Sequence, residues 1–174
     1  MRKLPSLMTL ALLLFIGYVS AQAKIIAYVG DFKIIKEEDP WEDKAVVYAL
    51  TKYDGGFMEG ASLVLHCDRD KTLLLIKTDF IISVPDLNPW VSVKYRIGKL
   101  KPEKADWMIA DKGDLLFPAT ELGMEIIGTL IKQRSNQFLV GVEDAIGEFH
   151  TLKFSVNGIE NLHKYLPCLN PNSF

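Results

Sequence analysis

Residues Ala61 to Lys77 read ASLVLHCDRDKTLLLIK, two apolar runs joined by a polar turn. In the first run Leu63, Leu65 and Cys67 occupy alternate positions, and alternate positions of a strand share one face. The second run is continuously apolar, as expected for a strand that is covered on both faces. The stretch therefore predicts a hairpin at the centre of a sheet, with Cys67 facing the core.

Further strand-like runs lie on both sides of this hairpin. The clearest is Val91 to Ile97, in which apolar residues alternate with Ser92, Lys94 and Arg96. The other runs are bounded by turn-forming residues and cover 24–29, 32–36, 45–51, 115–117, 137–142 and 148–156. These runs together predict a mainly β protein.

Two segments have helical rather than strand-like patterns. From Thr120 onward Leu122, Ile126 and Leu130 are four residues apart, which predicts a helix with one apolar face. Thr120 is expected to cap this helix, and Gly123 and Gly128 are expected to weaken it and to let it lie close to the sheet.

A second helix is predicted at the C-terminus. Asn157 is a good N-cap, Glu160 follows three residues later as in a capping box, and Pro167 ends the pattern. The predicted fold class is therefore mainly β (α+β). We expect an antiparallel β-sandwich or a curved sheet, with one inserted helix and one C-terminal helix.

The first 23 residues have the pattern of a signal peptide. Arg2 and Lys3 precede an apolar run, and Ala21 and Ala23 form a small-residue cleavage site. The alternative is a transmembrane anchor, but the run is shorter than the roughly 18 apolar residues that such a helix needs. We therefore expect residues 24–174 to form a single domain that is exported and is periplasmic or secreted.

The charge balance argues against nucleic acid as a partner. The formal net charge is −2, and loss of Arg2 and Lys3 with the signal peptide takes it to −4. Phosphate binding needs a strongly basic surface. We expect no nucleic-acid partner, and no membrane association once the signal peptide is cleaved.

Cys67 and Cys168 are the two cysteines of the chain. An even number of cysteines in an exported protein predicts a disulfide bond. Such a bond would tie the predicted C-terminal helix to the strand that holds Cys67. The alternative is a nucleophilic cysteine activated by a nearby histidine such as His66 or His150, which export and pairing disfavour.

Two groups of residues were weighed as metal ligands. His66, Asp68 and Asp70 alternate along a strand end, and residues 37–43 are rich in Asp and Glu. Neither group has the spacing of a known metal motif, and blocks of like charge are usually solvated. Hydrolase and phosphate-binding motifs are also absent from the sequence. We predict no metal, no cofactor and no catalytic residues.

Three pieces of sequence, in this order, carry a resemblance to a known family: LVLHC ending at Cys67, VKYRI ending at Ile97 with Trp107 downstream, and the terminal Cys168. The chain resembles the VasI/TagO-like family of small exported proteins associated with bacterial type VI secretion. The resemblance implies a periplasmic, β-rich domain with an accessory or binding role.

The sequence predicts a binding surface around Arg96, Lys94 and Trp107. These residues could receive an acidic peptide or a glycan, since Arg and Trp are frequent at interface hot spots. The alternative is that Trp107 belongs to the core and that Arg96 pairs with an acidic neighbour.

The predicted function is that of an exported, non-enzymatic accessory or binding protein. We expect its partner to be a protein, a component of a secretion system or of the envelope. The alternative is an exported inhibitor or immunity-type protein that binds a periplasmic enzyme. A hydrolase with an unrecognised site is a third and weaker hypothesis.

Overall fold

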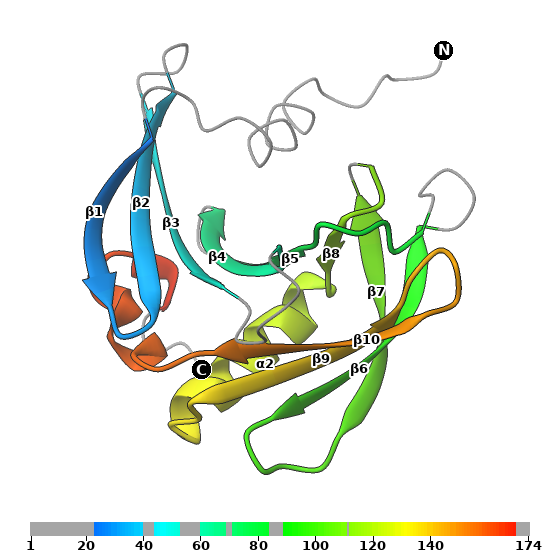
Figure 1. Ribbon diagram of the computed structural model, residues 1–174. Helices are drawn as coiled ribbons and strands as arrows, with labels where there is room; N and C mark the ends of the chain where they lie inside the picture. Colours follow the sequence, from blue (N-terminus) through cyan, green and yellow to red (C-terminus); the bar gives the residue numbers. More distant parts are fainter. Residues whose placement is uncertain are drawn as a thin grey trace, which may run out of the picture.

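The computed structural model describes residues 23–39, 44–52, 60–68, 71–83, 89–110 and 112–169. Within these described residues, ten strands form one antiparallel sheet in the order β1-β2-β3-β4-β5-β8-β7-β6-β9-β10 (Figure 1). The strands are β1 (Lys24–Val29), β2 (Phe32–Asp39), β3 (Lys44–Lys52), β4 (Ser62–Asp68), β5 (Lys71–Lys77), β6 (Trp90–Ile97), β7 (Glu103–Ala110), β8 (Leu115–Phe117), β9 (Gln137–Glu143) and β10 (Phe149–Ser155). The mainly β prediction is confirmed. The expected signal peptide lies outside the described residues, apart from Ala23.

The predicted central hairpin is formed by β4 and β5. In the sheet, β1 to β3 lie on the β4 side, and β8, β7, β6, β9 and β10 lie on the β5 side. Leu65 pairs with Leu74, and Cys67 pairs with Thr72. Leu63 and Leu65 are fully buried, as the alternation predicts. The prediction that β5 is covered on both faces is wrong, because its residues alternate between buried and half-buried positions. Only one face of β5 is fully buried in the core, and the other face is half-buried.

The sheet is a curved sheet, and its two ends meet. Thr51 in β3 donates a hydrogen bond to the Ser155 carbonyl oxygen at the end of β10, at 3.0 Å. The carboxylate of Asp31, in the β1–β2 turn, accepts hydrogen bonds from the Ser155 hydroxyl and the Asn157 amide. These bonds hold the β1–β2 hairpin against the end of β10.

The inserted helix, α2 (Thr120–Lys132), lies within the curve of the sheet and packs mainly on β5 (Figure 1). Ile126, Ile127 and Leu130 form its buried face. A Cβ placed on Gly123 would lie 3.7 Å from Cβ of Leu74, so the helix approaches the sheet closely there, as predicted.

The predicted cap of α2 is wrong by one residue. Ala119 holds the N-cap position and no side chain caps the helix. The Gly123 N–H donates to the Ala119 carbonyl oxygen at 2.9 Å, so Thr120 is already helical.

The predicted C-terminal helix is present as two short 3₁₀-helices, η2 (Ile159–Lys164) and η3 (Pro167–Leu169). Gly158 precedes η2 with φ of 86°, a left-handed conformation that breaks the capping box expected at Asn157. A Cβ on Gly158 would lie 3.0 Å from the Cα of Gly30, so contact with the β1–β2 turn imposes this conformation. Pro167 begins η3 instead of ending a helix.

One hydrophobic core joins the inner face of the sheet, α2 and the C-terminal segment. Its largest fully buried side chains include Trp107, Phe32, Phe138 and Phe154. Within the described part of the chain, no helix is long and apolar enough to cross a membrane.

Candidate functional site

The hairpin formed by β6 and β7 carries all three predicted binding residues, Lys94 and Arg96 in β6 and Trp107 in β7. Alternate residues of β6 face inward, because Val93, Tyr95 and Ile97 are buried, as the sequence predicts. Lys94 and Arg96 consequently lie on the outer face of the sheet. Lys94 is exposed, and Arg96 is partly exposed.

Five cationic side chains lie within the eleven residues 94–104, which we call the basic hairpin: Lys94, Arg96, Lys99, Lys101 and Lys104. Lys94 and Lys104 are directly opposite each other on β6 and β7, and both are exposed. Like charges in this position destabilise a sheet. None of the five forms an ion pair with a residue that the structure describes. The basic hairpin therefore holds five cations without a direct ion-pair partner among the described residues.

Glu103, the one acidic residue of the basic hairpin, is hydrogen-bonded to Tyr95 and pairs with none of the five cations. Its Oε2 accepts a hydrogen bond of 2.8 Å from the Tyr95 hydroxyl. Burial raises the pKa of Tyr95, and the hydrogen bond to Glu103 and the charges of Glu103 and Glu125 raise it further. Tyr95 consequently stays protonated and keeps the Glu103 carboxylate occupied.

A small pocket of about 40 Å³ lies where the basic hairpin meets α2. Arg96, Lys101, Glu103 and Glu125 all contribute to its wall. The Nε of Arg96 is buried and has no hydrogen-bond partner among the described residues. Because the wall holds two cations and two acids, the pocket itself has no strong charge preference.

The prediction that Trp107 forms part of a binding surface is wrong. Trp107 is 0% exposed. It pairs with Val91 on the inner face, and its ring centroid lies 6.1 Å from that of Tyr95. The alternative stated from the sequence, that Trp107 belongs to the core, is confirmed. The alternative pairing of Arg96 with an acidic neighbour is not found among the described residues.

A different aromatic residue lies on the outer face near Lys94. Phe149 in β10 is 59% exposed. A Cβ placed on Gly141 would lie 2.6 Å from Cζ of Phe149 and 3.5 Å from the Lys94 carbonyl oxygen, so the ring covers Gly141 beside β6. Sequence reasoning missed Phe149, although its alternation with the buried residues of β10 indicates an outward position.

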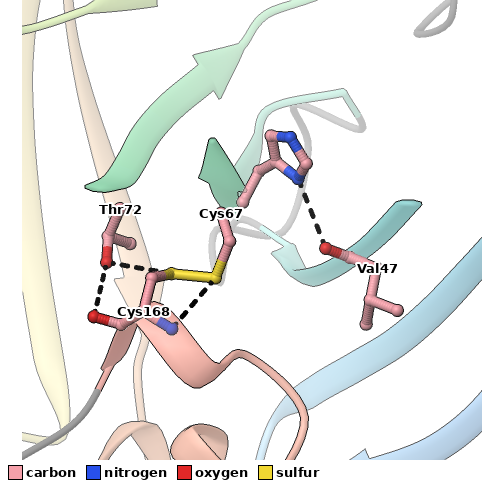
Figure 2. The surroundings of a disulfide bond; sticks show 5 residues. Val47, Cys67, Thr72 and Cys168 are labelled. Carbon is pink, nitrogen blue, oxygen red and sulfur yellow. Dashed lines mark hydrogen bonds between the residues drawn. A yellow bond between two sulfur atoms is a disulfide. The ribbon is translucent and has the colours of Figure 1, made fainter. Parts of the chain in front are cut away.

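The predicted disulfide joins Cys67 in β4 to Cys168 in η3, with Cα atoms 5.7 Å apart (Figure 2). The Thr72 hydroxyl donates to Cys168, with its oxygen 3.2 Å from Sγ and 3.4 Å from the carbonyl oxygen. Both cysteines are bonded, so the structure contradicts a nucleophilic cysteine. The Nδ1 of His66 lies 3.3 Å from the Val47 carbonyl oxygen, away from the disulfide.

The structure reveals a buried histidine–carboxylate pair that sequence reasoning missed. His150 Nε2 lies 2.8 Å from Asp144 Oδ2, and the imidazole stacks on Phe80 at 4.2 Å. Asp144 Oδ1 also accepts hydrogen bonds from the backbone N–H groups of Ile146 and Glu148. The hydrogen bond to His150 is the main cause that lowers the pKa of Asp144. The pair therefore stabilises the β9–β10 turn.

Asp144, Glu148 and His150 are also close enough to share a cation, with ligand atoms within 4.8 Å of one another. Hydrogen bonds of the turn already use both oxygens of Asp144. Of the candidate metal ligands in the sequence, Asp70, residues 40–43 and the side chains of Asp39 and Asp68 lie outside the described part.

No family model, curated protein or solved structure matches the chain. The resemblance to the VasI/TagO-like family stays a prediction from the sequence.

Proposed function

We propose that this chain is an exported, non-enzymatic accessory protein that acts by binding another protein of the envelope or of a secretion system. This is the role implied by its resemblance to the VasI/TagO-like family. The observation that carries the proposal is the basic hairpin, whose five cations have no ion-pair partner in the described fold. Exposed Phe149 beside Lys94 adds the aromatic character typical of interface anchors.

The position of the helix supports an accessible outer face. The buried residues of α2 pack against the inner side of the sheet, where Leu74 faces Gly123. Among described segments, η2 and η3 contact β1, β4 and β5, and neither is in substantial contact with β6 or β7. Ser92, Lys94 and Lys104 on the outer face of β6 and β7 are exposed among the described residues, which supports contact with a partner at this face.

The disulfide supports the exported part of the proposal. Disulfide bonds persist in oxidising compartments such as the periplasm and are rare in reducing ones. The buried position of Cys168, which is 8% exposed, is typical of a bond that serves stability. The proposal therefore includes export of the chain and cleavage of the signal peptide after Ala23.

Site-specific photo-crosslinking in cells that export the full chain tests this function. A photoreactive residue at Ser92 would sit on the outer face of β6, two residues from Lys94, and Ser92 is exposed. The matched control is the same residue at Glu160, which is exposed in η2. We expect a discrete cross-linked protein from position 92 and none from position 160.

Two results would contradict the proposal. One is the absence of any cross-linked protein from position 92 when the chain is folded and exported. The other is equal capture at both positions, which would indicate contact by chance. If the captured protein is an enzyme whose activity falls on binding, the role is that of an inhibitor, the alternative stated from the sequence.

A further inference from the structure

We propose that the partner docks on the basic hairpin through a short, extended segment rich in Asp and Glu. The inference rests on the proposed binding function and names the chemistry of its partner. It is carried by charge complementarity between the outer face of β6 and β7 and an acidic peptide.

The charge of the basic hairpin is opposite in sign to that of the chain. Residues 94–104 hold five cations and one acid, whereas the whole chain has a formal net charge of −2. Glu103, the one acid, is hydrogen-bonded to Tyr95. An anionic ligand would relieve the repulsion between Lys94 and Lys104, which face each other directly. An unfavourable pair in the free protein thus becomes a source of affinity in the complex.

The spacing of the cations fits an extended peptide. Lys94 and Arg96 are alternate residues of one strand and are therefore about 6.7 Å apart along it. Alternate side chains of an extended acidic segment have the same repeat, so two carboxylates can meet Lys94 and Arg96 in register. Lys104 lies across from Lys94 and supplies a second cation to the first carboxylate.

A peptide that binds this face must be recognised by side chains and not by backbone strand pairing. The strand β6 pairs with β7 on one side and with β9 on the other, so it has no free edge for a partner strand. The peptide would instead lie over the face, with the exposed ring of Phe149 as its apolar contact. Binding through surface charges is weakened by salt.

The same face argues against a membrane surface as the ligand. Asp106 is exposed and pairs with Ser92 at the other end of this face, and exposed Glu143 ends β9. A flat anionic bilayer would approach these acids as well as the lysines. A short segment of about four to six residues that runs from Lys94 and Lys104 toward Arg96 leads away from both acids, which lie at the Ser92 end of the face.

Fluorescence anisotropy with defined peptides tests the inference. The probe is a labelled peptide that alternates Glu and Ser, and its control replaces every Glu with Gln. We expect wild-type protein at about 20 mM salt to bind the Glu peptide and not the Gln peptide, and binding to weaken toward about 150 mM salt. Sedimentation with phosphatidylglycerol vesicles is the competing test, and we expect no binding.

The double variant Lys94→Glu/Lys104→Glu should weaken binding of the Glu peptide about tenfold or more, because two attractions become repulsions. The matched control is Lys112→Glu/Lys164→Glu, which makes the same charge change at two exposed positions outside the basic hairpin. It should leave the affinity within about twofold. Thermal melting should show that both variants fold.

The inference is overturned if wild-type protein ignores the Glu peptide at low salt, or if both double variants lose affinity equally. Binding to vesicles without binding to the peptide also overturns it and assigns the cations to lipid. The experiments distinguish failure of the acidic-segment inference from failure of the proposed binding function. A partner cross-linked at Ser92 together with no peptide binding would retain the binding role and reject only the acidic segment.

Discussion

Removal of the Cys67–Cys168 disulfide should lower the free energy of unfolding more than any other substitution proposed below. The variant is Cys67→Ala/Cys168→Ala, which leaves no free thiol because the chain has two cysteines. The bond links η3, at the end of the described chain, to β4 in the centre of the sheet. Its loss would free the C-terminal segment in the unfolded state.

The magnitude follows from the size of the closed loop. The bonded residues are 101 positions apart. In the chain-entropy description a loop of this size corresponds to about 4.7 kcal/mol at 25 °C. A domain of this size has a free energy of unfolding of about 5 to 15 kcal/mol. We therefore expect the double variant to lose about 4 to 5 kcal/mol and to be near the limit of folding.

Urea unfolding of mature protein, followed by tryptophan fluorescence, measures this loss because Trp107 is buried in the core. With a slope of about 2 kcal/mol per molar urea, the midpoint should fall by about 2 M. Wild-type protein reduced with dithiothreitol should behave like the double variant. The control is Thr72→Val, which removes the hydroxyl bonded to Cys168 but keeps the disulfide, and should cost about 1 kcal/mol.

A loss below about 1 kcal/mol in the double variant would refute the reasoning. It would mean that the C-terminal segment is held mainly by the burial of its apolar residues. A loss of 4 to 5 kcal/mol in Thr72→Val would also refute it, since the hydrogen bond would then explain what is assigned to the covalent link.

Three further predictions concern the turns and the helix. The Asp144→Asn variant weakens the hydrogen bond to His150 and should be less stable than wild-type protein at neutral pH. Because the pKa of Asp144 is lowered from 3.8 in the folded state, the stability advantage of wild-type protein over the variant should shrink as the pH falls below about 4. Urea midpoints of both proteins measured across this pH range test this. Gly30→Ala places a Cβ 2.1 Å from the Asn157 carbonyl oxygen at φ of 57°, and should cost about 2 kcal/mol or more in thermal unfolding. Gly123→Ala meets no atom closer than 3.4 Å and should be neutral or stabilise by up to about 1 kcal/mol, measured in the same way.

Controls separate these effects from general damage. Gly147→Ala has a similar positive φ of 85° but meets only the Glu143 carboxylate, at 3.6 Å, so it should cost about 1 kcal/mol, less than Gly30→Ala. Equal costs at the two glycines would reject the role of the close approach. An advantage of Asp144 that does not shrink as the pH falls below about 3.8 would reject its lowered pKa as the cause. A large loss in Gly123→Ala would mean that α2 lies closer to β5 than described.

Much of the strand pattern was predictable because it is local. The alternation from Val91 to Ile97 placed Val93, Tyr95 and Ile97 inside and Lys94 outside, and burial confirms this. Period-two alternation depends on one strand having one buried face, which needs no knowledge of the neighbours. The C-terminal helix lies where the sequence predicts it, but it forms 3₁₀-helices that begin after Gly158, because the local capping pattern competes with a contact to Gly30, more than a hundred residues away.

The candidate site was predicted in part. Lys94 and Arg96 were identified from their own strand, but Trp107 was placed on the surface, because a tryptophan is equally suited to a core and to an interface. Phe149 and the Asp144–His150 pair were missed, since their importance arises from packing against β6 and Phe80.

The sequence by itself determined the β-rich class, the inner and outer faces of the main strands, the position of α2 and the pairing of the two cysteines. These follow from residue periodicity and composition, which act over a few residues, and from the even number of thiols. Only the tertiary structure decided the strand order, the closure of the sheet at Asp31 and Ser155, and the lysine pair Lys94–Lys104. Those features depend on which strands become neighbours, and that choice is set by burial of the whole core and not by any local stretch.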